Sequence, residues 1–310
     1  MRVAVLCGVS AAMAPDLDVV IRSASDSLLA IQYHRHFTHA LAFVPVGAGF
    51  VAALWWFIFR RKIPFVHLWL YCAAGMATHG LLDSLTNYGT HYFWPFTAAR
   101  ESWNIISIVD PVFSLTLLAL LGAATIRRRR AYAAVGVVFA LLYWSAGYVQ
   151  RERATDAMMA TAASRGHAVE RSEVKPAFAT ILVWRTHYMF NGRFYIDAYH
   201  VAPGGGTVLY KGGDVAVFVP PALPVGSRLD GDIKRFSFFS DGWLAPLADN
   251  AAIIGDARFG LLPTDTNPLW GIEIDVNNAN AAAQFVSLRQ RRANDVAMLW
   301  NMVKGGPIAP

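Results

Sequence analysis

The sequence predicts an α-helical polytopic membrane domain of four to five transmembrane helices, followed by a small β-rich (α+β) soluble domain. Two observations support this fold class. Of the 310 residues, 55% are hydrophobic and only 15% are charged, which is too apolar for a single soluble globule. Long apolar runs occupy residues 39–149, whereas residues 150–310 hold most of the acidic residues, glycines and prolines. We therefore expect a transmembrane domain over residues 1–150 and a soluble extramembrane domain over residues 151–310.

Four stretches have the length and composition of membrane helices. Each is near the roughly 20 residues that cross a bilayer. They cover about residues 40–59, 65–85, 108–126 and 131–149. The apolar N-terminal piece Val3–Ala14 is shorter, and we expect it to be retained as a first helix. The alternative is a cleaved signal peptide, because the piece follows Arg2 and ends in small residues.

Basic residues predict the orientation of these helices. Seven of them form two groups, Arg60-Arg61-Lys62 and Arg127–Arg130, each directly after an apolar run. The positive-inside rule places both loops in the cytoplasm. The segment before Ala40, the loop Asn87–Ser107 and the C-terminal domain then lie on the periplasmic side of a bacterial inner membrane. Because the basic residues report topology, the net charge of +6 does not indicate a nucleic-acid partner.

The two cysteines predict neither a disulfide framework nor a thiolate metal site. Cys7 and Cys72 both lie within apolar segments, where a membrane thiol is the simpler interpretation.

Candidate metal ligands gather at the predicted periplasmic ends of the helices. His79 and Asp83 are four residues apart, so on a helix they share one face and can reach one ion. Ionisable residues inside a membrane span are costly and usually mark function. The segment before the first long helix adds imidazoles and hard carboxylate oxygens from His34, His39, Asp16 and Asp18. Three regions distant in sequence could thus supply one site.

Each of these candidate ligands could instead have a purely structural role. Asp16 and Asp18 could form a solvated turn after Pro15, and the histidines near residue 34 could be interfacial side chains. His79 and Asp83 could be a hydrogen-bonded pair inside the helix bundle. The histidines outside these regions lack partners at ligand spacing, and we do not expect His67, His91, His167, His187 or His200 to be ligands.

The residue types suggest a mixed imidazole and carboxylate site. We expect one or two divalent ions, zinc before iron or manganese. The expected ligands are Asp18, His34, His39, His79 and Asp83. Such an ion lowers the pKa of a bound water and supplies hydroxide for hydrolysis.

Three further residues have predicted roles around this site. Arg35 is expected to bind a phosphate or carboxylate oxygen and negative charge in the transition state, although a membrane-interface anchor is the alternative. Asp16 is the candidate general base. Asp110, at the start of the third long helix, could orient a ligand imidazole.

At these positions the sequence resembles a known family. The segments that carry the resemblance are Pro15-Asp16-Leu17-Asp18, His34-Arg35-x-x-Thr38-His39, His79-x-Leu81-Leu82-Asp83 with Thr86–Thr90, Trp94-Pro95-Phe96 and Asp110-Pro111. Their order and spacing are similar to those of the bacterial inner-membrane metal-dependent hydrolases called YdjM-like, over about residues 10–125. Two features depart from that family: a Thr-His pair on an N-terminal helix is absent, and His36 stands where members have glycine.

The resemblance has implications for activity. The family is similar to zinc phospholipase C and P1-type nucleases, which implies metal-assisted hydrolysis of a phosphoester. The substrate would be a small molecule or a membrane lipid head group. Two other classes of function stay open. A transporter would carry polar residues through several helices to the cytoplasmic side, and a structural metal site would have a closed shell of four protein ligands.

The C-terminal domain shows strand and turn signals. Predicted strands cover Thr180–Trp184, Arg193–His200, Thr207–Phe218 and Ile233–Phe239, with turns at Pro203–Gly206 and Asp230-Gly231. Apolar residues among charges predict an amphipathic helix over Ala281–Val303.

Overall fold

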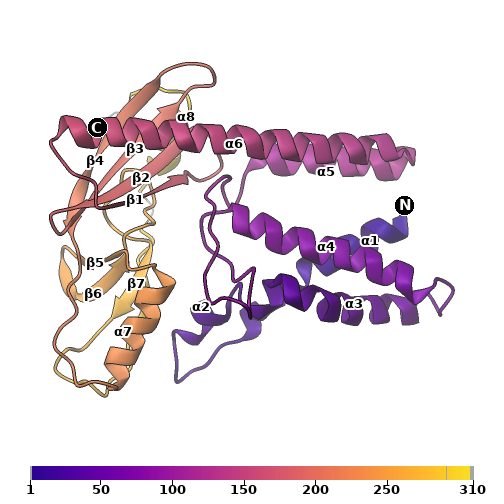
Figure 1. Cartoon of the computed structure of the whole chain (residues 1–310), viewed down its shortest axis with the longest axis horizontal. Helices are drawn as coiled ribbons and strands as arrows, with labels where there is room; N and C mark the ends of the chain where they lie inside the picture. Colours follow the sequence, from indigo (N-terminus) through magenta and orange to yellow (C-terminus); the bar gives the residue numbers. More distant parts are fainter. Residues whose placement is uncertain (1, 291, 308–310) are drawn as a thin grey trace. The chain divides into compact units, whose positions relative to one another are not determined.

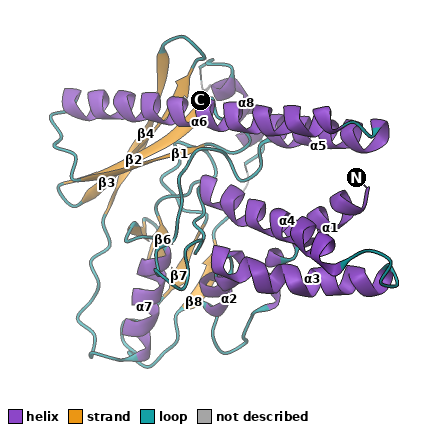
Figure 2. Cartoon of the chain, turned by 45° about the vertical axis from the view of Figure 1, so that its right-hand side comes forward, coloured by secondary structure: helices purple, strands orange, loops and turns teal. Residues whose placement is uncertain are grey.

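A computed structural model describes residues 2–290 and 292–307 (Figure 1). The chain divides into two compact units. One comprises residues 1–21 and 33–147, and the other comprises residues 22–32 and 148–310. The first contains apolar helices and the second contains two antiparallel sheets with helices beside them (Figure 2). The predicted fold class is therefore confirmed.

Apolar helices make up the first unit. They are α1 (Arg2–Met13), α3 (Val44–Ile58), α4 (Phe65–Leu85), α5 (Pro111–Arg127) and α6 (Arg130–Ser164), joined in part by the 3₁₀ turns η1 (Pro15–Val20), η2 (Phe37–His39) and η3 (Leu41–Phe43). Within the described residues, four segments are long and apolar enough to cross a membrane: Arg2–Val20, Leu41–Ile58, Phe65–Leu85 and Arg130–Ser164. The shorter α5 is also apolar. Helix α6 continues well past the predicted end at Val149, and its last turns pack in the second unit.

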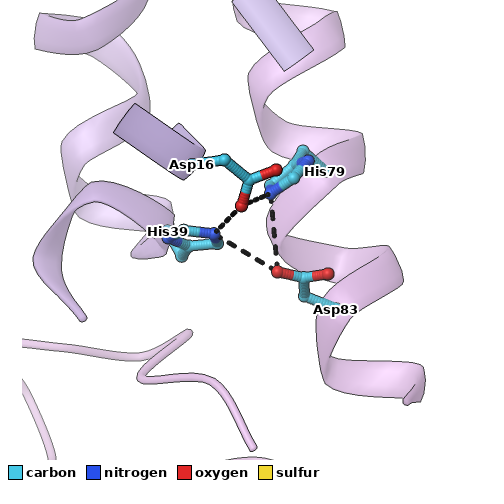
Figure 3. A group of neighbouring side chains, drawn as sticks. All are labelled: Asp16, His39, His79 and Asp83. Atoms are coloured by element: carbon cyan, nitrogen blue, oxygen red, sulfur yellow. Dashed lines mark hydrogen bonds and ion pairs between the residues drawn. The ribbon is translucent and has the colours of Figure 1, made fainter. Parts of the chain in front are cut away.

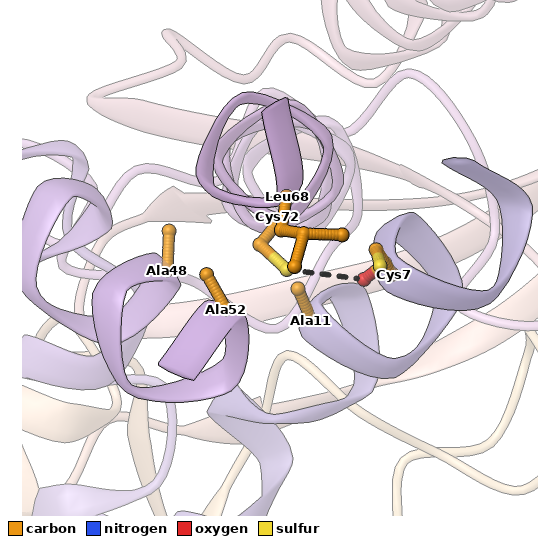
Figure 4. Close-up of a cluster of buried hydrophobic side chains, with 6 residues drawn as sticks. All are labelled: Cys7, Ala11, Ala48, Ala52, Leu68 and Cys72. Atoms are coloured by element: carbon orange, nitrogen blue, oxygen red, sulfur yellow. Dashed lines mark hydrogen bonds between the residues drawn. The ribbon is translucent and has the colours of Figure 1, made fainter. Parts of the chain in front are cut away.

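Helices α1, α3 and α4 pack against one another (Figure 4). Their shared core consists of fully buried, mostly small side chains: Cys7, Ala11, Ala48, Ala52, Leu68 and Cys72. Small side chains let membrane helices approach closely. The tightest crossing is at Gly75, where a Cβ atom would lie 2.1 Å from the carbonyl oxygen of Gly8. Both cysteines are free thiols.

Helix α5 begins at a capped N-terminus and packs along α6. The Asp110 carboxylate accepts a hydrogen bond from the backbone N–H of Phe113 at 3.1 Å, which satisfies one of the free donors of the first turn. The Phe113 ring then contacts Phe139 and Tyr143 of α6. These contacts hold the two helices together as a hairpin.

The second unit contains two four-stranded antiparallel sheets (Figure 2). The first has the order β1 (Arg171–Pro176), β2 (Val183–Phe190), β3 (Arg193–Val201) and β4 (Thr207–Ala216). The second has the order β5 (Leu244–Leu247), β6 (Asn250–Asp256), β7 (Trp270–Glu273) and β8 (Gln284–Ser287). The short helix α2 (Leu29–Tyr33) and helices α7 (Arg228–Phe239) and α8 (Asp295–Val303) complete the described elements.

Two sequence predictions for this unit are wrong. The predicted strand Ile233–Phe239 and the predicted turn at Asp230-Gly231 both lie inside α7. Its buried residues Leu229, Ile233 and Phe236 recur at helical spacing, and the Ser227 side chain caps the first turn.

The predicted amphipathic helix over Ala281–Val303 is only partly present. Residues 284–287 form strand β8, which pairs with β7, and the helix is confined to α8. Pairing with an existing strand edge overrides the local helical pattern here.

A charged cluster is buried in the C-terminal unit. Lys175 Nζ lies 2.7 Å from Glu173 Oε1, and His187 Nε2 lies 3.2 Å from Glu173 Oε2. The His187 side chain is fully buried against the Trp243 ring. Burial lowers the pKa of His187 to about 4, because desolvation outweighs its hydrogen bond to Glu173. His187 is therefore neutral in the folded protein at neutral pH.

We expect acid to destabilise this unit through His187. Below pH 6.5 the unfolded chain protonates this histidine while the folded chain does not, so stability falls as pH falls toward about 4. The expected loss between pH 6.5 and about pH 5 is about 2 kcal/mol. Thermal unfolding midpoints of the wild type and His187→Gln, followed by tryptophan fluorescence at both pH values, measure this loss. The variant should lose less stability than the wild type, and equal losses would contradict the assignment.

Candidate metal centre

Four side chains of the first unit converge on one point (Figure 3). Asp16, His39, His79 and Asp83, hereafter the His/Asp group, each offer one ligand atom, and these atoms lie within 4.8 Å of one another. His39 Nε2 lies 3.3 Å from both Asp16 Oδ1 and Asp83 Oδ2. His79 Nε2 lies 3.6 Å from the same Asp16 oxygen and 3.4 Å from Asp83 Oδ2. The four atoms thus surround a common centre.

Three elements position the His/Asp group. His79 and Asp83 stand one turn apart on α4, Asp16 lies on η1 and His39 ends η2. A Cβ atom at position 80 would lie 2.4 Å from the carbonyl oxygen of His39. Because Gly80 has no side chain, η2 can approach α4 closely enough for His39 to meet His79.

The donor set fits a divalent metal ion. His79 Nε2 and Asp83 Oδ2 are buried and are reached only by ion-pair contacts of 3.2–3.6 Å, without a hydrogen bond of good geometry, which is rare for buried polar atoms in folded proteins. An ion between them would satisfy both atoms. Two imidazole nitrogens with two carboxylate oxygens suit zinc, iron or manganese.

The electrostatics of the group also favour a cation. Burial lowers the pKa of His39, but hydrogen bonds to the carboxylates of Asp16, Asp18 and Asp83 outweigh it and raise the pKa to about 10. The carboxylates that stabilise a protonated imidazole would equally stabilise a divalent ion.

The His/Asp group is exposed at Asp16. The His39 side chain is fully buried and that of Asp83 is 12% exposed, whereas 53% of the Asp16 side chain is exposed. Water and a substrate can therefore reach the ligand atoms past Asp16.

Asp18 does not belong to the His/Asp group but contacts one of its members, His39. Its carboxylate accepts hydrogen bonds from the Arg35 N–H at 2.8 Å and the Thr38 hydroxyl at 3.1 Å, and it lies 2.8 Å from His34 Nδ1. It also lies 3.3 Å from His39 Nδ1, the ring nitrogen that faces away from the other ligand atoms. The geometry thus favours Asp16 as the ligand in place of Asp18, and Asp18 as the residue that orients His39. His34, predicted as a ligand, contacts Asp18 rather than the group.

We expect Asp18→Asn to weaken metal binding without abolishing it. The carboxylate fixes the ring orientation and basicity of His39, and removing such a partner typically costs about tenfold or more in metal affinity. A metal titration with a competing chelator measures the change. A complete loss of stoichiometric metal in Asp18→Asn would instead show that Asp18 is itself a ligand.

Arg35 is fixed beside the group in an unusual backbone conformation. Its φ of 60° is left-handed, which is strained for a residue other than glycine. The conformation directs its N–H to Asp18 and its carbonyl oxygen to the N–H of His91. Strain held in this way is often found at functional sites.

The Arg35 guanidinium is held by contacts that the sequence did not predict. Its Nε lies 3.2 Å from Asp83 Oδ2, Nη1 donates to the Thr86 hydroxyl at 3.0 Å, and the group lies over the Tyr88 ring at 5.2 Å. Thr86 and Tyr88 follow α4 directly, and their position just after the ligand pair is the only sequence signal for this role. The buried guanidinium lies beside the ligand atoms, where it can bind an anion.

The remaining sequence candidates lie elsewhere. Asp110 caps α5 and accepts a hydrogen bond from the Tyr143 hydroxyl at 2.7 Å, instead of orienting a ligand imidazole. His36 and His91 pack ring to ring at 4.4 Å. Burial lowers the pKa of His91 to about 3, which keeps this ring neutral.

Part of the chain is similar to known proteins. A family model described as the YdjM inner membrane protein matches residues 2–154. The chain is 29% identical over 119 residues to the uncharacterized protein YfhP of Bacillus subtilis, which covers 38% of this chain and 35% of that protein. It is 32% identical over 108 residues to the inner membrane protein YbcI of Escherichia coli, which covers 33% of this chain and 60% of that protein.

Both relatives match over only part of their own length, less than two thirds in each case. No solved structure matches the chain significantly. Together with the four apolar spans, the family match identifies a multi-pass inner membrane protein. Residues 2–154, which include the His/Asp group, thus match the model of the YdjM inner membrane protein family.

Proposed function

We propose that this protein is a membrane-bound metal-dependent hydrolase that cleaves a phosphoester, in a small molecule or a lipid, at the periplasmic face of the inner membrane. The observation that carries the proposal is the His/Asp group, whose four ligand atoms lie within 4.8 Å of one another beside a buried arginine. The basic loops after α3 and α5 support a periplasmic site, because the positive-inside rule assigns them to the cytoplasm.

In this proposal, the residues around the metal centre have different roles in hydrolysis. A divalent ion held by Asp16, His39, His79 and Asp83 would supply a water of lowered pKa and would polarise a phosphoryl oxygen. The exposed Asp16 carboxylate holds the attacking water and accepts its proton through the oxygen that does not face the imidazoles. Arg35 binds a non-bridging phosphate oxygen and stabilises the charge that develops on it.

A structural metal site is the second candidate, because the group already contains four ligand atoms. Four protein ligands typically close the shell of a structural zinc. The half-exposed Asp16 favours the hydrolase, since a structural site is usually sealed from solvent. Activity measurements separate the two candidates.

We expect Arg35→Lys to retain metal and lose most activity. Lysine keeps the positive charge but lacks the planar guanidinium that contacts Asp83, Thr86 and the phosphate at the same time. Loss of one hydrogen-bond donor to the developing negative charge typically lowers kcat about 100-fold. The assay measures release of p-nitrophenol from bis(p-nitrophenyl) phosphate by zinc- or manganese-loaded protein in detergent. Phosphatidylglycerol vesicles serve as the lipid substrate.

Wild-type turnover should depend on added metal and should stop with chelator. His67→Ala is the matched control, because His67 is an exposed histidine at the other end of α4. Metal-loaded wild-type protein that hydrolyses neither probe would favour the structural site.

A further inference from the structure

A groove in the first unit begins one turn from the His/Asp group. It has a volume of about 580 Å³, within the range of about 300–1,000 Å³ that is usual for small-molecule sites. Its walls come from α1, α4, α5 and the start of α6, and they include Ala4, Gly8, Ala12, Gly75, Thr78 and Ala124. Arg130 lies at the end of the groove away from the metal centre.

The groove lies in line with the metal ligands. On α4, Gly75 is one turn before His79, and Thr78 directly precedes it. On the other wall, Ala12 is one turn before Asp16. The groove therefore points toward the His/Asp group, although the four residues of that group do not themselves line it.

The walls are mostly apolar, and their polar side chains are Tyr71, Thr78 and Arg130. The Thr78 hydroxyl donates to the carbonyl oxygens of Ala74 and Gly75 at 2.9 Å, so its hydrogen-bonding capacity is used within the helix. The Ser10 hydroxyl of α1 likewise contacts Trp55 and the α1 backbone instead of the groove. An apolar chain matches such walls better than a polar solute does.

We propose that the groove binds one acyl chain of a membrane lipid and places the polar group of that lipid at the metal centre. Between Ala4 and Ala12 the groove extends about 12 Å along α1, close to the roughly 15 Å depth of one bilayer leaflet. Val9 and Leu121 on its rim are exposed, so a chain can enter sideways from the bilayer. The inference rests on the proposed function, because it makes a lipid the substrate of the same centre.

The test uses a lipid that carries a photoreactive group. Full-length protein is reconstituted in phosphatidylethanolamine vesicles that contain phosphatidylglycerol with a diazirine in one acyl chain. After illumination, mass spectrometry locates the labelled residues. We expect label on the groove faces of α1 and α4, in excess of label on the exposed α3 residues Phe50 and Leu54.

Two neighbouring alanines provide a matched pair of variants. Ala133 lines the groove and Ala134 is an exposed neighbour on the same helix. Ala133→Phe should lower groove labelling about tenfold relative to Ala134→Phe, because displacing two methylene groups from an apolar groove costs about that factor. Ala4→Phe provides a second blocking variant on another helix if the first does not fold.

Three results would overturn the proposal. The first is even labelling of α1, α3 and α4 that no blocking variant changes. The second is cross-linking between two copies of the chain through the groove. The third is labelling that disappears in Arg130→Gln, which would place the lipid head group at the opposite end.

Labelling and hydrolysis are measured separately, so the two proposals fail separately. Groove labelling without metal-dependent turnover leaves the lipid site and removes the hydrolase. Turnover of the soluble phosphodiester without groove labelling supports the hydrolase and contradicts the lipid site.

Discussion

Gly80→Ala is expected to lower metal affinity by about 10- to 100-fold although it removes no ligand. The added methyl group would lie 2.4 Å from the carbonyl oxygen of His39, and a backbone atom cannot move aside as a flexible side chain can. Relief of the clash requires η2 to withdraw from α4 and carries His39 away from His79. Loss of the correct ligand orientation typically costs an affinity change of this size.

The control for this variant is another helical glycine. A Cβ atom at Gly122 of α5 would meet no atom within 4 Å. Gly122→Ala should therefore leave metal affinity unchanged and stabilise the helix slightly, since alanine has the higher helix propensity. Zinc titrations of both variants against a chelator make the comparison. Equal affinities in Gly80→Ala and wild type would show that η2 does not need this close approach.

Most of the membrane fold could be predicted from the sequence. Helix α4 begins at Phe65 and ends at Leu85, as its apolar composition predicts, because hydrophobic length alone determines a membrane span. His79 and Asp83 could be recognised on the same ground, since charged groups inside a span are costly. Local physical chemistry was sufficient for these features.

The choice between Asp16 and Asp18 could not be made from the sequence. Both follow Pro15, and the two side chains point in different directions because η1 is a 3₁₀ helix with about three residues per turn. Asp16 faces His39 Nε2 and His79, whereas Asp18 faces Arg35 and Thr38. Only the path of the backbone decides which carboxylate reaches the centre.

Tertiary contacts explain the other differences. In α7, strand-forming residues such as Ile233 and Phe236 lie in a helix, because the helical spacing of its apolar residues buries one face. The anchoring of Arg35 by Thr86 and Tyr88 depends on how η2 meets the end of α4. The helical spacing in α7 is a local signal that the strand prediction missed, whereas the Arg35 contacts are set by tertiary structure.

The most direct test of the His/Asp group is the metal content of purified protein. Elemental analysis compares the wild type with His79→Ala and Asp83→Ala, and His67→Ala on the same helix is the control. We expect about one divalent ion per chain in the wild type and the control, and nearly none in the two ligand variants, because removing one of four ligands leaves an incomplete shell. Circular dichroism establishes that the variants stay folded. Folded wild-type protein that takes up no divalent ion after loading with zinc, iron or manganese would contradict the metal centre, and with it the hydrolase.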